Sequence, residues 1–369
     1  MSELPEDVFG DILTRLSPKD LLRFRCVSKR WCALIDSPRF IKLQLNRSLE
    51  TGTNLSLIYR NDSEICSVDL DMLDGDSVER RLVVVEVDNP IPIQTEDCWT
   101  SVEGSCNGLI CLHRYIDEVI ALLNPSTKEY IILPPLPPLH EKPLFAALPF
   151  TGLVYDPVGD DYKVVQIVQY LDRFNTFWSE VMVCSLRSKM WRRVCESFAH
   201  HLYVLSKMPW LCSRNPGVLV NGALHWLACR DRVDLFDIVV AFDPVVEEHW
   251  VMEVPKVSGY SKGTLGVLGG CLCLICAMKE RDTVELWVMN NYRVEESWTK
   301  LFRVMFEVHS PGCPRVLAYC RSSREVILLE MFGNLIWYDL KEKKAVDLGI
   351  CSSFADVNVK SLVKLNHYQ

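Results

Sequence analysis

The sequence lacks the features of a membrane-spanning, secreted or nucleic-acid-binding protein. No apolar run approaches the roughly 18–20 residues that a membrane-spanning helix needs. The N-terminal residues Met-Ser-Glu-Leu-Pro-Glu-Asp are acidic and contain no apolar stretch typical of a secretory signal. The formal net charge is −8, from 40 basic and 48 acidic side chains, which opposes broad contact with phosphates. We therefore expect no membrane span, no secretory signal and no nucleic acid partner.

The sequence also lacks the signatures of several enzyme classes. It has no Gly-x-Ser-x-Gly nucleophile elbow, no phosphate-binding P-loop and no glycine pattern for dinucleotides. The pair Asp160-Asp161 with Lys163 is compatible with acid–base chemistry. Its Pro-Val-Gly-Asp-Asp-Tyr context instead favours a hairpin turn, in which aspartate bonds the local backbone. We predict a non-catalytic protein without a cofactor.

Cysteine, by contrast, is abundant, with 16 residues in a chain that has no export signal. This combination predicts reduced thiols and a location in the cytoplasm, the nucleus or both. The segment Cys271-Leu272-Cys273-Leu274-Ile275-Cys276 is the most suggestive metal pattern in the chain. A structural zinc site needs four ligands, commonly two close pairs, whereas these cysteines lie in an apolar strand pattern without a neighbouring Cys/His cluster. We interpret them as core side chains and predict no metal site.

Residues 1–47 show the apolar spacing of short helices, beginning with Leu4 to Leu16. Ser17-Pro18, Ser28 and Ser37-Pro38 are typical helix starts, with serine as the N-cap and, in two of them, proline in the first turn. Three or four such helices bury little surface, and a module of this size often relies on a partner. The segment holds nine basic and six acidic residues, a net charge of +3, so the rest of the chain carries −11 to give the total of −8.

The order and spacing of residues in this segment carry a family resemblance. Leu4-Pro5-Glu6-Asp7-Val8, Ile12–Leu16, Leu21–Trp31 and Ile35–Phe40 follow one another as in an F-box, which the segment resembles along its whole length. The resemblance implies docking onto a Skp-family adaptor and, through it, onto a cullin and a RING protein of a ubiquitin ligase. The positions that it assigns to adaptor binding are Leu4, Pro5, Val8, Ile12, Leu13, Leu16, Leu21, Leu22, Val27 and Trp31. Several of these also have to fill the core of the module.

After Leu45 the helical pattern gives way to short β-rich runs separated by turn residues. One recurring hairpin turns at residues 107, 160, 221, 269 and 322, in steps of 53, 61, 48 and 53 residues. A second hairpin follows each of the first, which makes four strands per unit. A period of about fifty residues with four strands is typical of kelch-like propellers. A large β-sandwich is the alternative, but it does not account for a period sustained over five units.

Two further segments extend this repeat. Residues 53–100 are expected to supply a sixth unit, and the run Val357–Leu365 is expected to pair with it. The predicted fold is therefore a small all-α module, residues 1–47, followed by an all-β domain, residues 48–369. We expect the β domain to be a kelch-like β-propeller of about six four-stranded blades.

The β region carries a second resemblance, through motifs that follow one another along the chain. They include Ser105–Cys111, Asn124-Pro125-Ser126-Thr127, Tyr155-Asp156-Pro157, Val220–Trp226 and Phe242-Asp243-Pro244. In these motifs the region is similar to the plant F-box-associated domain of the first type. The chain as a whole most resembles the constitutive-expresser-of-pathogenesis-related-genes group. That resemblance implies a substrate receptor that controls the abundance of immune receptors in plant defence.

The two resemblances together predict a non-catalytic substrate-recognition subunit of a Skp–cullin–F-box ubiquitin ligase. The β domain would bind a protein target for ubiquitination and degradation, with an immune receptor as the finer hypothesis. Two alternatives remain open: an enzyme with a centre in the propeller channel, and a ligase-independent interaction scaffold.

Residues that bind the target are expected on long loops of the β domain. The candidates are Trp210, as an aromatic anchor, and Pro135 and Pro138. The two prolines belong to the rigid, extended cluster Leu133–Pro138, which is more typical of a loop between blades than of a docking segment.

Overall fold

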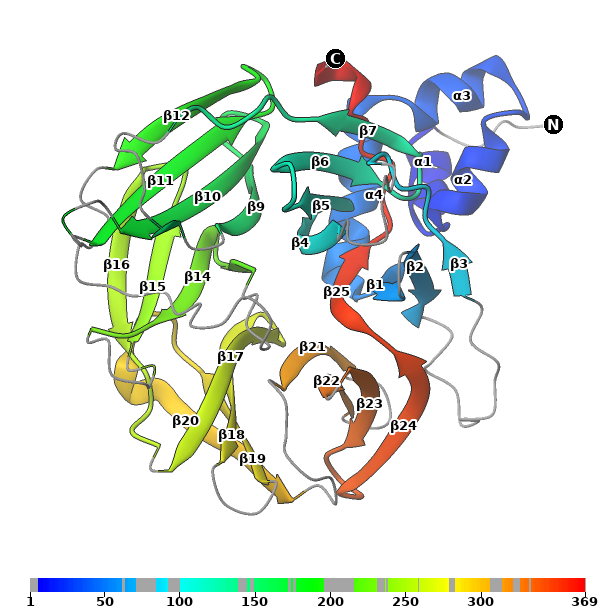
Figure 1. The fold of residues 1–369 in the computed structure, drawn as a ribbon. Coiled ribbons are helices and arrows are strands. Elements are labelled where there is room, and N and C mark those ends of the chain that lie inside the picture. The colour runs from blue at the N-terminus through cyan, green and yellow to red at the C-terminus, as the bar shows by residue number, and fades with distance from the viewer. Residues whose placement is uncertain are drawn as a thin grey trace. The chain divides into compact units, whose positions relative to one another are not determined.

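Four α-helices open the chain, where the apolar spacing predicts them (Figure 1). They are α1 (Glu6–Thr14), α2 (Pro18–Phe24), α3 (Lys29–Ile35) and α4 (Pro38–Thr51). The predicted N-caps are confirmed, because the hydroxyls of Ser17, Ser28 and Ser37 each accept a hydrogen bond from the backbone N–H three residues further on. Gly52 ends α4 in the left-handed conformation, at φ 64°, which glycine adopts without steric cost. Among the described residues, no helix combines the length and apolar character needed to cross a membrane.

The structure is a computed structural model. It describes residues 6–61, 64–70, 84–91, 100–138, 145–146, 149–171, 174, 177–195, 216–230, 236, 238–257, 259–278, 283–305, 314–320, 326–331 and 333–368. The chain forms two compact units: an N-terminal unit of residues 1–133 with 354–369, and a second unit of residues 134–353.

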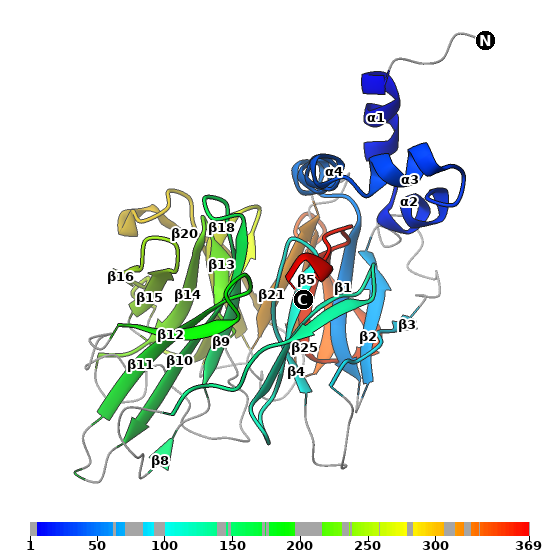
Figure 2. The same cartoon turned by 90° about the horizontal axis from the view of Figure 1, so that it is seen from above.

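The N-terminal unit contains the helices and two antiparallel sheets. The strands of the first sheet, in spatial order, are β25 (Ser353–Val359), β1 (Leu55–Asn61), β2 (Glu64–Asp69) and β3 (Val84–Glu86). The strands of the second are β4 (Thr100–Cys106), β5 (Leu109–Arg114), β6 (Val119–Asn124) and β7 (Glu129–Ile132). A C-terminal strand does lie beside the unit of residues 53–100, since β25 pairs with β1. The expected bounds are wrong, because β25 ends at Val359 and only residues 357–359 of the run Val357–Leu365 belong to it. Figure 2 shows α4 leading into β1 at one end of this sheet.

The described residues of the second unit form four antiparallel sheets. The first of them orders β12 (Met190–Cys195), β11 (Phe177–Ser185), β10 (Asp161–Leu171) and β8 (Phe145–Ala146), and β10 also pairs with β9 (Phe150–Asp156). The next consists of β13 (Val218–Val220), β14 (Ala223–Ala228), β15 (Ile238–Asp243) and β16 (Glu248–Glu253). The third consists of β17 (Tyr260–Leu268), β18 (Cys271–Met278), β19 (Thr283–Met289) and β20 (Trp298–Met305), with the 3₁₀ turn η2 (Glu295–Ser297) before β20. The last consists of β21 (Arg315–Cys320), β22 (Val326–Met331), β23 (Asn334–Asp339) and β24 (Lys344–Cys351).

The turns between the third and fourth strands share one design, which explains the repeated Asn and Asp residues of the sequence. The last residue of the third strand points a side-chain oxygen at N–H groups of the turn. Asp243 accepts two such hydrogen bonds, at 2.8 and 3.3 Å, and Asp339 accepts two at 2.9 Å. The turn then closes through a residue with φ between 52° and 62°, namely Lys128, Lys189, Glu247 and Lys343.

Alternate residues of the central strands pack against different neighbouring sheets. In β18, the side chain of Cys276 packs in a cluster with Leu227 and Val239 of the preceding sheet. Cys273 packs in a different cluster, with Ile327 and other residues of the sheet that follows. This alternation is what a strand buried on both faces requires, because successive side chains point to opposite sides.

Candidate functional site

The apolar positions predicted to bind an adaptor include three exposed side chains. Val8 and Ile12 are 46% and 45% exposed, and Val27 is 60% exposed. Val8 and Ile12 are four residues apart on α1 and so lie on one face of that helix. Leu4 and Pro5 of the same prediction lie outside the described residues. The helix face of Val8 and Ile12 is called the α1 face below.

The other predicted positions are partly or fully buried. Leu13 and Leu21 are buried in the core of the helices, whereas Leu16, Leu22 and Trp31 are half-buried and pack against that core. A side chain that fills the core has little area left for a partner, so these residues support the adaptor surface by holding the helices together. Their direct contact with an adaptor stays a prediction.

Trp31 joins three helices through its ring. Its centroid lies 4.9 Å from that of Phe9 on α1, with the ring planes at 67°. It lies 5.7 Å from that of Phe24 on α2, with the planes at 89°. Both contacts are edge-to-face, an arrangement that stabilises an aromatic pair by about 0.5–1.5 kcal/mol beyond its burial. The α1 face is therefore held in place by an aromatic cluster behind it.

The carboxylate of Asp36, at the end of α3, forms ion pairs with Arg25 and Lys364. It accepts a hydrogen bond from Nη2 of Arg25 at 2.8 Å and lies 3.0 Å from Nζ of Lys364. The thiol of Cys32 donates to it as well, at 3.4 Å. Burial alone would raise the pKa of Asp36, but the hydrogen bonds from Lys364, Cys32 and Arg25 outweigh burial and hold that pKa below 3.8.

The candidate target-binding residues of the second unit are placed only in part. Pro135 and Pro138 are exposed, and Trp210 lies outside the described residues. The backbone of the proline segment is anchored to β12, because Nε1 of Trp191 donates to the carbonyl of Pro134 at 2.7 Å. Nη2 of Arg193 donates to the carbonyl of Pro138 at 3.3 Å. An anchored segment suits the loop interpretation, and the role of its prolines in target binding stays a prediction.

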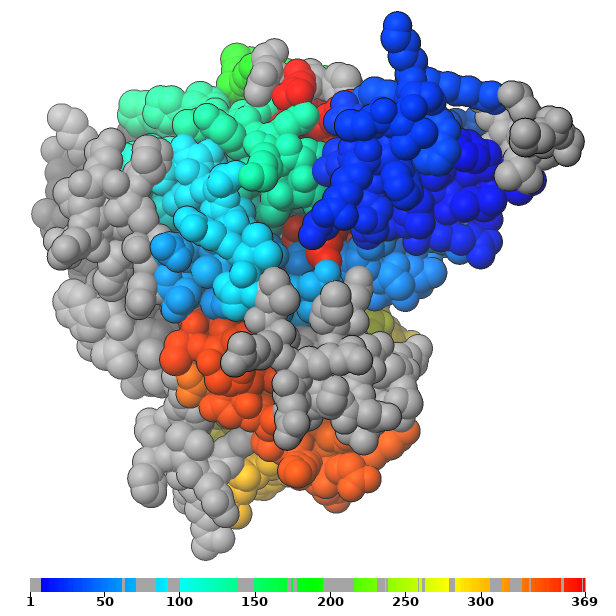
Figure 3. Space-filling model, turned by 90° about the vertical axis from the view of Figure 1, so that its right-hand side faces the viewer, coloured from blue at the N-terminus to red at the C-terminus, as the bar shows by residue number. Residues whose placement is uncertain are grey.

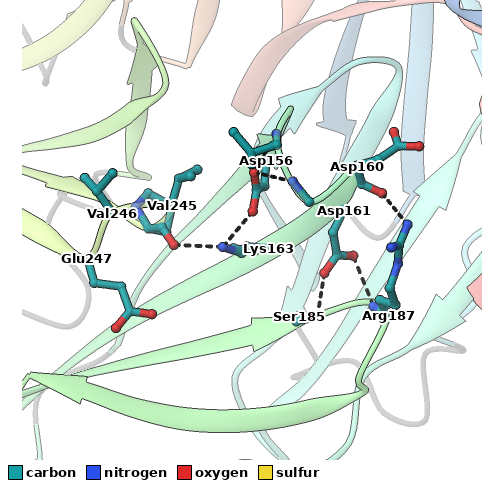
Figure 4. Close-up of polar contacts among 12 residues, drawn as sticks. Asp156, Asp160, Asp161, Lys163, Ser185, Arg187, Val245, Val246 and Glu247 are labelled. Carbon is teal, nitrogen blue, oxygen red and sulfur yellow. Dashed lines mark hydrogen bonds and ion pairs between the residues drawn. The ribbon is translucent and has the colours of Figure 1, made fainter.

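The acidic pair that suggested acid–base chemistry belongs to a hairpin turn, as its sequence context predicts (Figure 4). Asp161 accepts hydrogen bonds from the hydroxyl of Ser185 and from the backbone N–H of Arg187. Nζ of Lys163 donates to the carbonyl of Pro244 at 3.0 Å and lies 2.9 Å from the carboxylate of Asp156. These groups join the turn before β10 to the turns before β12 and β16.

Electrostatics keep the first carboxylate of this turn ionised. Burial would raise the pKa of Asp156, but hydrogen bonds from the N–H of Gly159 and from Lys163 outweigh it and lower the pKa. A carboxylate held in this way is a weak proton acceptor at neutral pH. The arrangement therefore favours a structural role for this turn.

His225 is fully buried in β14. Its Nδ1 lies 3.0 Å from the carbonyl oxygen of Val218, and its Nε2 lies 2.9 Å from the hydroxyl of Tyr292. The neutral ring suits both partners if Nδ1–H donates to the carbonyl and Nε2 accepts from the tyrosine. Burial is the main cause that lowers the pKa of His225 from 6.5 to about 4, and the charge of Arg293 adds to it.

This pKa predicts a loss of stability on acidification. Between pH 6.5 and 4 the unfolded chain protonates His225 and the folded chain does not, so the free energy of unfolding falls as the pH falls. The effect of this single group approaches about 3 kcal/mol at pH 4. Urea unfolding at several pH values, compared between the wild type and His225→Gln, is expected to show a shallower pH slope in the variant. His249→Gln, at an exposed position of β16, serves as the control, and equal slopes for His225→Gln and the wild type would contradict the prediction.

The cysteines of the suggestive metal pattern do not converge on one point. Cys273 and Cys276 lie in separate apolar clusters on the two faces of β18, so one ion cannot bind both. Burial raises the pKa of the Cys276 thiol to about 12, which keeps it protonated. Within the part of the chain that the structure describes, no group of three or more His, Cys, Asp or Glu side chains is arranged to hold a metal ion.

Comparison with known proteins gives consistent matches over nearly the whole chain. A family model for the F-box domain matches residues 1–43, and one for the F-box associated beta propeller domain matches residues 58–360. The Arabidopsis thaliana F-box protein CPR1 is 36% identical over 98% of this chain and 89% of its own length. F-box protein At4g22390 of the same plant is 37% identical over 98% of this chain and 90% of its own length. F-box/kelch-repeat protein At3g23880, also of that plant, is 29% identical over 91% of this chain and 87% of its own length.

These matches bear on two predictions made from the sequence. The fold class is confirmed: a helical F-box is followed by a β-propeller of six sheets. The resemblance to the constitutive-expresser-of-pathogenesis-related-genes group is confirmed by the similarity to CPR1. Among solved structures, a chain of a nidogen–laminin complex aligns with 83% of this chain and 99% of its own, at 10% identity and a TM-score of 0.47, a level that supports no further inference.

Proposed function

This chain belongs to the F-box proteins that carry an F-box associated β-propeller domain, and we propose on that premise that it is a substrate receptor of a Skp–cullin–F-box ubiquitin ligase. In this role the helices bind a Skp-family adaptor, which in turn binds a cullin and a RING protein. The β domain binds a protein target. The chain itself performs no chemistry, because the ubiquitin carrier and the RING protein supply the transfer step.

The exposed apolar α1 face is the observation that carries the proposal. Val8 and Ile12 expose nearly half of their surface on a short helix whose neighbouring face, with Phe9 and Leu13, already packs in a core. Full burial of an exposed apolar side chain of this size contributes about 1.5–3 kcal/mol. Because Val8 and Ile12 are already about half buried, a partner surface that covers the rest gains about half of that for each. The match of residues 1–43 to the F-box domain identifies the class of partner as a Skp-family adaptor.

The mechanism of such a receptor is proximity. Holding a target beside a charged ubiquitin carrier turns a rare collision between two proteins into a reaction within one complex. The receptor therefore needs two surfaces at a fixed separation, and neither surface needs a catalytic group. The finer proposal, from the resemblance to the group that includes CPR1, is that the target is an immune receptor of a plant and that the complex acts in the cytoplasm, the nucleus or both.

Reconstitution with purified proteins tests the receptor role. The full chain is expected to co-purify with a Skp-family adaptor and, when cullin and RING protein are added, to migrate as one complex in size-exclusion chromatography. A chain that lacks residues 1–47 serves as the matched control, because it keeps the sheets and loses the helices. A full chain that elutes apart from the adaptor would refute the proposal.

Proximity labelling with the proteasome inhibited identifies the target. A true target is expected to be labelled both by the full chain and by the chain that lacks residues 1–47. When the proteasome is active, the target is expected to accumulate only in cells that express the chain lacking residues 1–47. Immune receptors absent from both labelled sets would overturn the finer proposal and leave the receptor role intact.

A further inference from the structure

The helices and the last residues of the sequence share one core. Leu362, which follows β25, is 2% exposed and lies in the same cluster as Leu13, Leu21 and Ile35. Val363 packs against that cluster as well. The helices of residues 6–51 therefore do not complete their own core, since a side chain more than 300 positions away closes it. Residues 360–366 are called the strap below.

The strap also carries a charge contact to the helices. Nζ of Lys364 lies 3.0 Å from Oδ1 of Asp36, the carboxylate that accepts the hydrogen bond from Arg25. Lys364 and Asp36 are each about three-quarters buried, with side-chain exposures of 22% and 26%. A partly buried pair is screened less by solvent than a surface pair, so it orients the strap against α2 and α3.

On its other side the strap is bound to the second sheet of the N-terminal unit. Nδ2 of Asn124 donates to the carbonyls of Ser361 and Val363, at 3.2 and 2.7 Å. The carboxylate of Glu129, on β7, accepts hydrogen bonds from the backbone N–H groups of Leu365 and Asn366, at 2.7 and 3.3 Å. These contacts involve the backbone of the strap, so they hold its path whatever the side chains are.

The turn between β4 and β5 lies close against the strap and has a glycine at the point of contact. Gly108 follows β4 with φ +88°, and a Cβ on it would lie 2.0 Å from Oγ of Ser361 and 2.8 Å from the carbonyl oxygen of Val359. No side chain fits at that distance, so the close approach of strap and turn requires glycine. Figure 3 shows the C-terminal residues, in red, lying between the dark blue helices and the blue-to-cyan strands of this unit.

We propose that the strap is part of the adaptor-binding module, which is therefore discontinuous in sequence and fixed to the sheet of β4–β7. Leu362 and Lys364 bind the helices, while Asn124 and Glu129 bind the backbone on either side of them. Adaptor affinity then depends on residues 360–366, and the helices keep one orientation to the sheet. The expected dependence of adaptor affinity on the strap rests on the proposed function, whereas the expected dependence of helix stability on the strap does not.

Hydrogen exchange of the full chain and its affinity for a Skp-family adaptor test the proposal together. Leu362→Asn is expected to leave the module folded only about a tenth of the time, which weakens adaptor binding about tenfold and accelerates amide exchange in α1–α3 by more than about tenfold. Leu335→Asn, a matched change at a buried leucine of β23, is expected to leave both quantities within twofold of the wild type. Exchange in β13–β20 reports whether each variant is folded.

Two further variants keep the test decisive. Lys364→Met retains the apolar stem and removes the charge, so it is expected to fold and to give a smaller acceleration, about two- to fivefold. A chain truncated after Val359 is expected to show the largest acceleration. Two outcomes overturn the proposal. In the first, Leu362→Asn and the truncated chain both show exchange in α1–α3 within twofold of the wild type. In the second, their exchange is accelerated but their affinity for the adaptor is unchanged. A wild-type chain that fails to bind the adaptor refutes the proposed function instead, and exchange alone then decides the role of the strap.

Discussion

Replacing Ile12 with aspartate is expected to weaken binding of a Skp-family adaptor by about a hundredfold or more. Ile12 lies on the α1 face beside Val8, with 45% of its surface exposed in the free chain. An interface that covers this face would have to bury the new carboxylate without a partner, which costs far more than the loss of apolar contact. Because the position is half exposed, the aspartate is tolerated in the free protein. Isothermal titration calorimetry with purified adaptor measures the change.

A matched control separates this effect from a general effect of charge. Ile116 is 63% exposed in the turn after β5, so Ile116→Asp makes the same chemical change on a sheet of the same unit. It is expected to leave adaptor affinity within twofold of the wild type. If Ile12→Asp also binds within twofold, with unaltered circular dichroism, the α1 face lies outside the interface and the docking residues have to be sought elsewhere on the helices.

Replacing Trp226 with alanine is expected to lower the free energy of unfolding of the second unit by about 3–5 kcal/mol. Trp226 is fully buried in a cluster with Phe150, Val165 and Phe242. The packing around it is close, since a Cβ on Gly217 would lie 2.6 Å from its ring. A cavity of this size in a domain whose total stability is typically about 5–15 kcal/mol removes much of the folded population at elevated temperature. Urea unfolding, followed by far-ultraviolet circular dichroism, measures the change in the free energy of unfolding.

The phenylalanine variant shows which property of the tryptophan matters. Nε1 of Trp226 is buried and has no hydrogen-bond partner among the residues that the structure describes. Trp226→Phe removes that unpaired donor and keeps most of the ring, so it is expected to cost no more than about 1.5 kcal/mol. Val158→Ala, at a position that is 87% exposed, is expected to change stability by less than about 0.5 kcal/mol. A loss in Trp226→Ala no larger than that in Val158→Ala would show that the core tolerates the cavity.

Much of the local structure could be predicted from short stretches of sequence. Ser17, Ser28 and Ser37 indicate three helix starts, because serine is favoured at the N-cap, where its hydroxyl accepts a hydrogen bond from the N–H three residues further on. The hairpin turns are equally local, since Asn107-Gly108 and Asn221-Gly222 supply the left-handed residues that tight turns need. Each of these signals acts over three or four residues and is complete within its own segment.

The sites were harder to predict, because exposure is a property of the packed chain. The apolar periodicity marks Val8, Ile12, Leu13 and Leu21 alike, yet only the first two remain exposed. The sequence does not indicate that the strap packs against the helices, since Leu362 belongs to the apolar run Val357–Leu365, which by its pattern is expected to pair with another strand. Its role depends on Asn124 and Glu129, which hold its backbone from over 200 positions away.

Short patterns along the sequence are therefore enough to predict the kinds of element, their order, and the family to which the chain belongs. Helix caps, turn residues and strand alternation act through local sterics and hydrogen bonds, which are already present in a short peptide. The folded chain is needed to see which apolar residues stay on the surface and that residues 353–366 return to β1 and to the helices. Such contacts depend on closing a loop of some 300 residues, whose entropy is repaid only when the intervening sheets have formed.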